Sequence, residues 1–202
     1  MPKNIYLRSS EELIKYINED LPNESLIILD SALEQFKLHT NFNASHVYLN
    51  VSEETKNLET VEKIWEIMFS SNLNRSDAIV IIGGGVMLDL CSFAASTYKR
   101  GIAFTLVPST LLAHGGKNGF NNYYGKNQIG TFNLPKGVVV CFELLNTLKD
   151  KDYKDGLIEL VKHGLIGSKE IFDKLVSTEN FKIDTEIIKK GIQIKEDIVE
   201  ED

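Results

Sequence analysis

The sequence predicts an α/β fold of the Rossmann-like type, followed by a segment that is entirely helical. Short apolar runs rich in β-branched residues, typical of strands buried on both faces of a sheet, alternate with longer segments whose apolar residues recur at helical spacing. From Tyr153 onward the strand-like runs stop and helical spacing alone continues. We therefore expect an α/β domain over residues 1–150 and the first helices of an all-helical domain over residues 151–202.

Composition excludes several classes of protein. The 202 residues carry a formal net charge of -7, and lysine and arginine are scattered without a basic block, which argues against nucleic acid as a partner. The sequence shows no apolar run long enough to span a bilayer and no N-terminal secretion signal, so we expect a cytoplasmic protein with no membrane partner. Cys91 and Cys141 do not form a CxxC pair and are interpreted as small buried residues in a reducing compartment.

The stretch from Ala78 to Asp89, AIVIIGGGVMLD, organises the predicted fold. Its first five residues are expected to form a central strand, and helical spacing runs from Val86 to Tyr98. The three glycines between them give a turn that tolerates unusual backbone angles and lets a phosphate approach bare amide groups at the start of the helix. Asp89 lies one turn into that helix, within reach of a ligand. Many α/β turns need glycine for backbone geometry alone, so a phosphate site and a purely structural turn are both open here.

The remaining elements continue the alternation. A short amphipathic helix is expected at Ser9 to Tyr16, where the capping pattern Ser-Ser-Glu-Glu precedes apolar residues. Further strands are expected at residues 25–30, 47–50, 103–107 and 138–141, and further helices through residues 61–68 and from residue 187 to the end. Residues 114–131 are rich in Gly, Asn and Lys with little apolar periodicity, so we expect a long connection of functional importance. The last helix stops at Glu-Glu-Asp without a cap, and we expect a further segment to follow it.

Several polar side chains follow the predicted strands. Asp30 can either accept a hydrogen bond from a ribose hydroxyl or cap the next helix, and both interpretations stand. Glu53 and Lys56 lie in a connection at the same height, where spacing alone favours a solvated, capped helix start. Lys117 and Lys126 each follow a glycine; they either direct an ammonium group at an anionic ligand or lie in a solvated loop.

Three polar residues share one face of an otherwise apolar helix in the last quarter of the chain. Glu159 and His163 stand four residues apart, with Lys162 beside them. Glu and His at this spacing can hold a metal ion, although a solvated polar stripe is the commoner explanation. The other histidines have no ligand-like spacing to this helix.

An ordered set of motifs resembles the 3-dehydroquinate synthase family, a group of sugar phosphate cyclases related to the glycerol dehydrogenases. The resemblance extends from about Asp30 to the end of the chain. The matching stretches, in the order of the family, are SEETKNLET, GGGVMLDLCSFAASTYKRG, VPSTLLA, GGKNG, GKNQIGTF, LP and GLIELVKHGLI. Such an ordered set is far more specific than a single glycine motif.

The resemblance implies a dehydroquinate synthase-like fold with an NAD site, a substrate site and a divalent metal. The implied NAD-binding residues are Glu53, Lys56, Gly84, Gly85, Asp89, Ser109, Thr110, Lys117, Lys126 and Thr147, and the strand-end position adds Asp30. The implied substrate contacts are Arg100, Lys117, Asn127, Lys162 and Lys195. Arg100 would reach the phosphate of a substrate bound to the neighbouring subunit of a homodimer. Glu159 is implied as the first ligand of zinc or cobalt.

The family's reaction explains these residue types. It turns 3-deoxy-D-arabino-heptulosonate 7-phosphate into 3-dehydroquinate and phosphate, on the path to chorismate and the aromatic amino acids. Bound NAD removes a hydride to give a transient ketone, phosphate is eliminated, the hydride returns, and an internal aldol step closes the carbocycle. The implied metal and lysines would polarise the developing oxyanion, and the cationic side chains would hold the substrate's phosphate and carboxylate.

Three departures from the family pattern keep other hypotheses open. The Val-Asp-Ser-Ser-Val run that the family carries between His114 and Gly115 is absent, Leu88 and Ser92 replace glycines, and the sequence stops before the two histidine metal ligands. One hypothesis is a 3-dehydroquinate synthase or its N-terminal portion, with little or no turnover expected from the 202 residues alone. The alternative is a non-catalytic remnant or nucleotide-binding module of the same fold. A related sugar phosphate cyclase comes next, and a polyol dehydrogenase ranks last.

Overall fold

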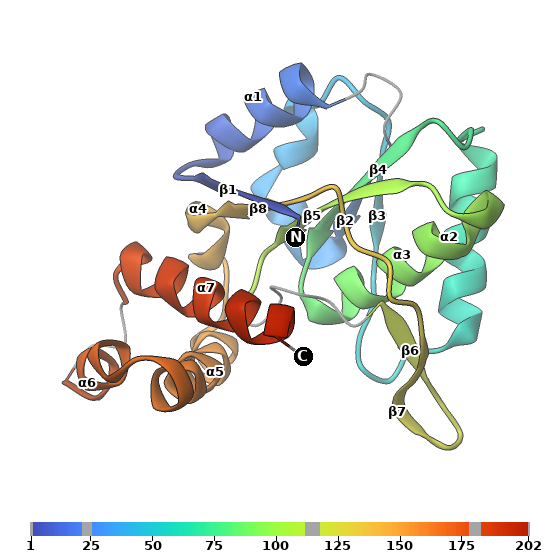
Figure 1. Cartoon of the computed structure of the whole chain (residues 1–202). Coiled ribbons are helices and arrows are strands. Elements are labelled where there is room, and N and C mark those ends of the chain that lie inside the picture. Colours follow the sequence, from blue (N-terminus) through green and yellow to red (C-terminus); the bar gives the residue numbers. More distant parts are fainter. Residues whose placement is uncertain (1, 22–25, 112–117, 178–182, 202) are drawn as a thin grey trace.

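The structure is a computed structural model that describes residues 2–21, 26–111, 118–177 and 183–201. Within these residues, six strands form one sheet in the order β1-β8-β5-β4-β2-β3, and all neighbours are parallel. The strands are β1 (Lys3–Leu7), β2 (Leu26–Asp30), β3 (His46–Leu49), β4 (Ala78–Gly83), β5 (Ala103–Pro108) and β8 (Gly137–Cys141). The predicted α/β fold with a buried parallel sheet is confirmed, and β4 lies near its centre as expected (Figure 1).

Helices cover both faces of the sheet. The α-helices are α1 (Ser10–Asp20), α2 (Leu58–Ser70), α3 (Gly85–Thr97), α4 (Phe142–Leu145), α5 (Asp150–Gly167), α6 (Lys169–Ser177) and α7 (Thr185–Glu201). The short 3-10 helices are η1 (Ser31–Phe36), η2 (Leu38–Asn41) and η3 (Tyr98–Arg100). As the capping pattern predicts, the Ser9 side chain accepts a hydrogen bond from the Glu12 N–H at the start of α1.

The alternation of side chains along the strands divides the core into two layers. Ile27 and Val80 point to the face covered by α1, whereas Ile28 and Ile79 point to the face covered by α2 and α3. These strand residues are at most 1% exposed, which is why the sequence shows continuous apolar runs instead of alternation. The layer under α2 and α3 also contains apolar residues of α5 and α7, so the later helices pack into the same core cluster as the sheet.

Two elements differ from the sequence prediction. The sequence does not predict strand β1. Its segment, KNIYL, has too short an apolar run to indicate a strand, and it is extended because it pairs with β8. Part of the expected loop at residues 114–131 is an antiparallel hairpin of β6 (Gly119–Asn122) and β7 (Gly125–Gly130). The Asn122 side chain closes its turn by accepting from the N–H groups of Tyr124 and Gly125. The GGKNG motif up to Lys117 lies outside the described residues.

The three glycines after β4 matter because they lack a side chain, and not because of their backbone angles. None of Gly83, Gly84 and Gly85 has a left-handed φ, and Gly84 has φ −79° and ψ 177°. A Cβ on Gly83 would lie 2.7 Å from Cγ and 2.9 Å from Cβ of Met87, whereas a Cβ on Gly85 would meet nothing within 4 Å. The turn therefore does not use the tolerance of glycine for unusual backbone angles. Gly83 is needed for the close approach of β4 and α3, and Gly85 leaves open space.

The two residues that replace family glycines are accommodated in the core. Leu88 is fully buried, and its N–H donates to the Gly84 carbonyl in the first turn of α3. Ser92 is also fully buried, and its hydroxyl has no hydrogen-bond partner among the described residues. Both cysteines are free and buried, as predicted.

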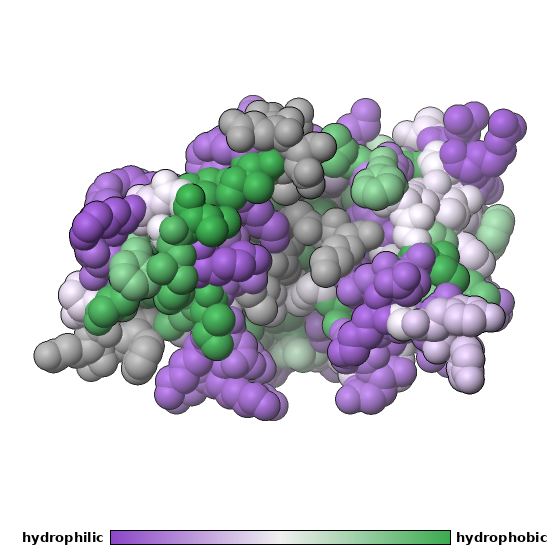
Figure 2. All heavy atoms as spheres, turned by 60° about the horizontal axis from the view of Figure 1, so that its bottom comes forward, coloured by the Kyte–Doolittle hydropathy of each residue, from purple (hydrophilic) through white to green (hydrophobic). Residues whose placement is uncertain are grey.

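The helices α5 to α7 lie together beside the sheet, and their outer surface is partly apolar (Figures 1 and 2). Ile158, Leu165, Ile166 and Val176 are each at least 60% exposed. Figure 2 shows apolar side chains gathered on this side of the molecule, and mostly polar ones on the side of the β6–β7 hairpin. None of the described helices is both long and apolar enough to cross a membrane.

We expect Gly83→Ala to lower the free energy of unfolding by about 1–3 kcal/mol, because the new methyl group overlaps Met87 in a core that has no spare room. Urea denaturation measures this change. Gly85→Ala is the matched control and should stay within roughly 0.5 kcal/mol of the parent, since its methyl group meets open space. Equal losses for the two variants would contradict the steric explanation.

Candidate functional site

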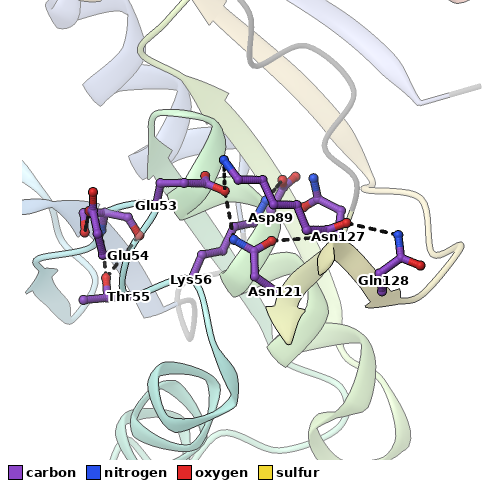
Figure 3. Close-up of polar contacts among 10 residues, drawn as sticks. Glu53, Glu54, Thr55, Lys56, Asp89, Asn121, Asn127 and Gln128 are labelled. Carbon is purple, nitrogen blue, oxygen red and sulfur yellow. Dashed lines mark hydrogen bonds and ion pairs between the residues drawn. The ribbon is translucent and has the colours of Figure 1, made fainter. Parts of the chain in front are cut away.

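The candidate site lies at the carboxyl edge of the parallel sheet, where ligands bind in open α/β folds. Strands β4 and β5 end side by side, with Gly83 in register with Pro108. The Ser109 N–H donates to the Gly83 carbonyl at 2.9 Å, which joins the two chain segments just beyond the strands. The turn at residues 52–57 and the β6–β7 hairpin meet at this edge (Figure 3).

The N-terminus of α3 faces this edge without a side-chain cap. Gly84 is the N-cap residue, and because it has no side chain it makes no side-chain cap bond to the first turn. The N-terminal N–H groups of a helix lack partners within the helix and carry a partial positive charge. Because a Cβ on Gly85 would meet nothing within 4 Å, an anionic group can approach these N–H groups closely.

A buried ion pair joins α3 to the turn before α2. The Lys56 Nζ lies 2.5 Å from Oδ2 of Asp89, and the two side chains are 4% and 11% exposed. Lys56 Nζ also donates to Oδ1 of Asn127 on β7, at 2.6 Å. Spacing alone favoured a solvated position for Lys56, and that interpretation is wrong. The helix start is capped by Asn57 instead, whose side chain accepts from the Thr60 N–H, so Lys56 is left to point inward.

Glu53 lies at the outer side of this cluster. Its Oε1 accepts a hydrogen bond from the Asn121 side chain at 2.8 Å and lies 3.4 Å from the Lys126 Nζ. The hydrogen bond from Asn121, together with the positive charges of Lys126 and Lys56, holds the pKa of Glu53 below its ordinary value. Asn121 was not singled out by the sequence, because nothing in its spacing distinguishes it from the neighbouring asparagines.

A second polar group lies on α5 and α7. Lys162 Nζ donates to Oε1 of Glu159 at 2.6 Å, and Nε2 of the buried His163 lies 3.6 Å from the same oxygen. Burial opposes ionisation of Glu159, but the hydrogen bond from Lys162 and the charges of Lys162 and Lys195 outweigh it and lower the pKa of Glu159. The structure thus brings Lys195 close to Glu159 although they are far apart in sequence.

The other candidate residues occupy separate positions. Asp30 caps η1 by accepting from the Ala32 N–H, and its Cβ lies beside Gly83. The Thr147 hydroxyl donates to the Leu144 carbonyl after α4, and Thr110 lies next to Gly84. Arg100 is exposed in η3 with a left-handed φ of 71°.

Two of the sequence predictions cannot be placed in the structure. Lys117 lies outside the described residues, and so does the point between His114 and Gly115 where the family run is absent.

The comparison with known families decides the assignment. A family model described as 3-dehydroquinate synthase N-terminal matches residues 46–155. The chain belongs to the 3-dehydroquinate synthase family. The match covers the turn at residues 52–57, α3, the hairpin and the strands that carry them, so it includes the Lys56, Asp89 and Asn127 cluster.

Curated relatives extend this similarity along the chain. The 3-dehydroquinate synthase of Campylobacter curvus is 38% identical over 207 residues, covering 93% of this chain and 59% of the relative. The 3-dehydroquinate synthase of Pyrococcus furiosus is 41% identical over 178 residues, covering 84% of this chain and 51% of the relative. The chain therefore spans a little over half the length of these relatives.

Solved structures show the same fold. The 2-epi-5-epi-valiolone synthase of Streptomyces hygroscopicus, with NAD+ and Zn2+ bound, has a TM-score of 0.84 at 20% identity, covering 98% of this chain and 61% of that one. A 2-deoxy-scyllo-inosose synthase has a TM-score of 0.77 at 26% identity, covering 95% of this chain and 58% of that one. The Rossmann-like fold prediction is confirmed by these similarities.

We expect Lys56→Met to lower the free energy of unfolding by about 3–5 kcal/mol, because it removes the cation that faces the buried Asp89 carboxylate. Urea denaturation at neutral pH measures the loss. The double variant Lys56→Met/Asp89→Leu should recover much of this stability, since it removes both buried charges together. A double variant whose loss equals the sum of the two single losses would show that the two charges are not coupled.

Proposed function

We propose that this chain is the nucleotide-binding portion of a 3-dehydroquinate synthase, which turns 3-deoxy-D-arabino-heptulosonate 7-phosphate into 3-dehydroquinate and phosphate. The proposal depends most on one observation. A buried lysine, a buried aspartate and a half-buried asparagine, drawn from three separate segments, meet near the N-terminus of α3. Burying charged groups costs free energy, so such a cluster at a ligand-binding edge favours a functional role.

The described residues fit a dinucleotide. The open space at Gly85 and the free N–H groups of α3 suit its diphosphate, with Gly84 giving close access. Ser109, Thr110 and Asp30 lie around the same turn. The ion pairs Lys56–Asp89 and Glu53–Lys126 lie at the same edge of the sheet, and Thr147 follows α4. NAD, when bound, would supply the reversible removal and return of a hydride. The 2-epi-5-epi-valiolone synthase structure, which holds NAD+, supports this choice.

The substrate would be held by cationic side chains. Lys162 and Lys195 lie near Glu159, and Asn127 projects from the hairpin. Ammonium groups suit the phosphate and the carboxylate of a sugar acid phosphate, because both anions accept charge-assisted hydrogen bonds. Lys117 belongs to the same proposal from its place in the family motif.

We propose a homodimer in which Arg100 contributes to the neighbouring subunit's site. Arg100 is exposed, and no carboxylate among the described residues forms an ion pair with it. An exposed guanidinium suits a phosphate, which it can bind through two parallel hydrogen bonds. We also propose a cytoplasmic location, which the two free thiols support.

The residues that the structure describes do not complete a metal site. Among the described residues, no group of three or more His, Cys, Asp and Glu side chains could hold a metal ion. Glu159 is proposed as one ligand of zinc or cobalt, with the others supplied from outside these residues. Zinc sites use at least three protein ligands, so tight binding needs more than Glu159.

The incomplete metal site among the described residues favours a second candidate function, a nucleotide-binding module without catalysis. A nucleotide-binding module without catalysis needs the α3 site but no metal, and a related sugar phosphate cyclase would use both with another substrate. The 2-deoxy-scyllo-inosose synthase similarity keeps the cyclase alternative in view.

We expect titration calorimetry of the purified chain to show NAD binding, and Gly85→Leu to weaken that binding at least about tenfold. The leucine side chain would extend into the space proposed for the diphosphate, and its Cβ would meet nothing within 4 Å. Thermal unfolding checks that the variant is folded. No heat of binding from the parent chain would contradict the NAD proposal, and equal affinities would place the nucleotide elsewhere.

Activity is tested in the same sample by phosphate release from the heptulosonate phosphate with added zinc. We expect little release from the chain alone, because the metal ligands are incomplete. We expect release when the part of the Campylobacter curvus enzyme beyond the matched region is added as a second polypeptide. Nucleotide binding without release in either mixture would favour the module.

A further inference from the structure

Three polar groups of Asn121 form hydrogen bonds within the candidate site: its backbone N–H, its side-chain Nδ2 and its side-chain Oδ1. Its backbone N–H donates to the Lys56 carbonyl at 2.8 Å. Its side-chain Nδ2 donates to Oε1 of Glu53 at 2.8 Å, and its Oδ1 accepts from the Asn127 N–H at 2.9 Å. Figure 3 shows this side chain between the turn at residues 52–57 and the hairpin. One residue therefore connects both segments that surround the buried Lys56.

The bond to Asn127 fixes a residue in an uncommon conformation. Asn127 has a φ of 53°, in the left-handed region that asparagine tolerates better than most residues. Its Oδ1 must nevertheless point inward to accept from the Lys56 Nζ. The bond from the Asn127 N–H to Asn121 holds the backbone in the orientation that makes this second bond possible.

The bond to Glu53 fixes the other segment. The Asn121 amide holds one carboxylate oxygen of Glu53, and the Lys126 ammonium approaches the same oxygen from β7. Asn121 therefore sets the distance between the turn that carries Glu53 and Lys56 and the hairpin that carries Lys126 and Asn127.

The hairpin has a separate apolar anchor. The Phe120 ring, next to Asn121 in sequence, packs edge-on against Phe93 of α3 with centroids 5.1 Å apart, and Phe120 is 4% exposed. Apolar burial of this size holds the hairpin on α3 without help from Asn121. Loss of the Asn121 side chain should therefore alter the alignment of the hairpin and not its attachment.

We propose that Asn121 is a positioning residue for the nucleotide site: it aligns the hairpin with the turn at residues 52–57 so that Lys56, Asp89 and Asn127 face a bound dinucleotide as one unit. This inference rests on the proposed NAD function. Asn121 acts through Glu53 and Asn127 and need not touch the nucleotide itself. The family motifs in the sequence do not assign it this role.

Asn121→Ala removes both side-chain bonds, and Asn121→Asp separates them. Aspartate keeps the acceptor for the Asn127 N–H but loses the donor to Glu53 and sets a second carboxylate beside it. Lys126 and Lys56 are the cations that face this pair. Two adjacent carboxylates share a proton at low pH, which restores a hydrogen bond between them, and repel each other once both ionise. Affinity of the Asp variant should therefore fall as pH rises, whereas affinity of the parent should stay nearly constant.

Asn18 provides a matched control. On α1, its side chain also donates one hydrogen bond, to the Asn41 carbonyl at 2.8 Å, and accepts one, from the Asn43 N–H at 3.0 Å. Helix α1, which carries Asn18, packs on the other face of the sheet, away from α3 and the hairpin. Asn18→Ala removes an equivalent pair of bonds outside the site.

The test measures NAD affinity by titration calorimetry at pH 5 and pH 8, with thermal unfolding of each variant. We expect Asn121→Ala to bind NAD about tenfold more weakly than the parent at both pH values, and Asn18→Ala to bind as the parent does. We expect Asn121→Asp to approach the parent at pH 5 and to lose about tenfold at pH 8.

The outcomes separate this inference from the function on which it rests. A parent chain that does not bind NAD overturns the proposed function. A parent that binds NAD as tightly as both Asn121 variants do, at both pH values, overturns the positioning role alone. If Asn121→Ala does not fold, the pH dependence of the folded Asp variant decides, because a purely structural residue would not make affinity depend on pH in this range.

Discussion

The buried ion pair between Lys56 and Asp89 is the constraint around which the site is built. An ammonium group with only 4% of its side chain exposed needs an anion and further hydrogen bonds, or its desolvation would oppose folding. Asp89 supplies the anion from α3, and Asn127 supplies a carbonyl oxygen from β7. The pair therefore ties together three segments that are distant in sequence, and it places a polar cluster at the carboxyl edge of the sheet.

Strand β4 and the turn and helix α3 that follow it meet two opposing requirements. The helix must approach the strand closely, which leaves no room for a side chain at Gly83, where Met87 packs. The N-terminus of α3 must also stay open, and Gly85 provides this because its missing side chain faces empty space. The core accommodates Leu88 and Ser92, which replace glycines of the family, and both are fully buried in α3. Within a few residues, the chain thus passes from a tightly packed core at Gly83 to an accessible helix N-terminus at Gly85.

The helices α5 to α7 connect the sheet to the second polar cluster. A Cβ on Gly156 would lie 2.6 Å from Leu111, which shows how closely α5 approaches the segment after β5. A Cβ on Gly191 would lie only 2.4 Å from the end of the Leu160 side chain, so α7 packs directly on α5. This close packing brings the charge of Lys195 near enough to lower the pKa of Glu159. Large apolar side chains of these helices stay exposed on the surface of the molecule (Figure 2).

The sequence by itself determined the layers of the fold, because a parallel sheet buried on both faces requires continuous apolar strands and helices with an apolar face. It also indicated Asp89 and the glycine turn, since their positions follow from local spacing. Tertiary structure alone decided that Lys56 is buried, that residues 119–130 form a hairpin, and that Asn121 joins the two. The burial of Lys56 and the link made by Asn121 depend on contacts between segments about 30 to 70 residues apart, and local spacing carries no record of which side chains such contacts bring together.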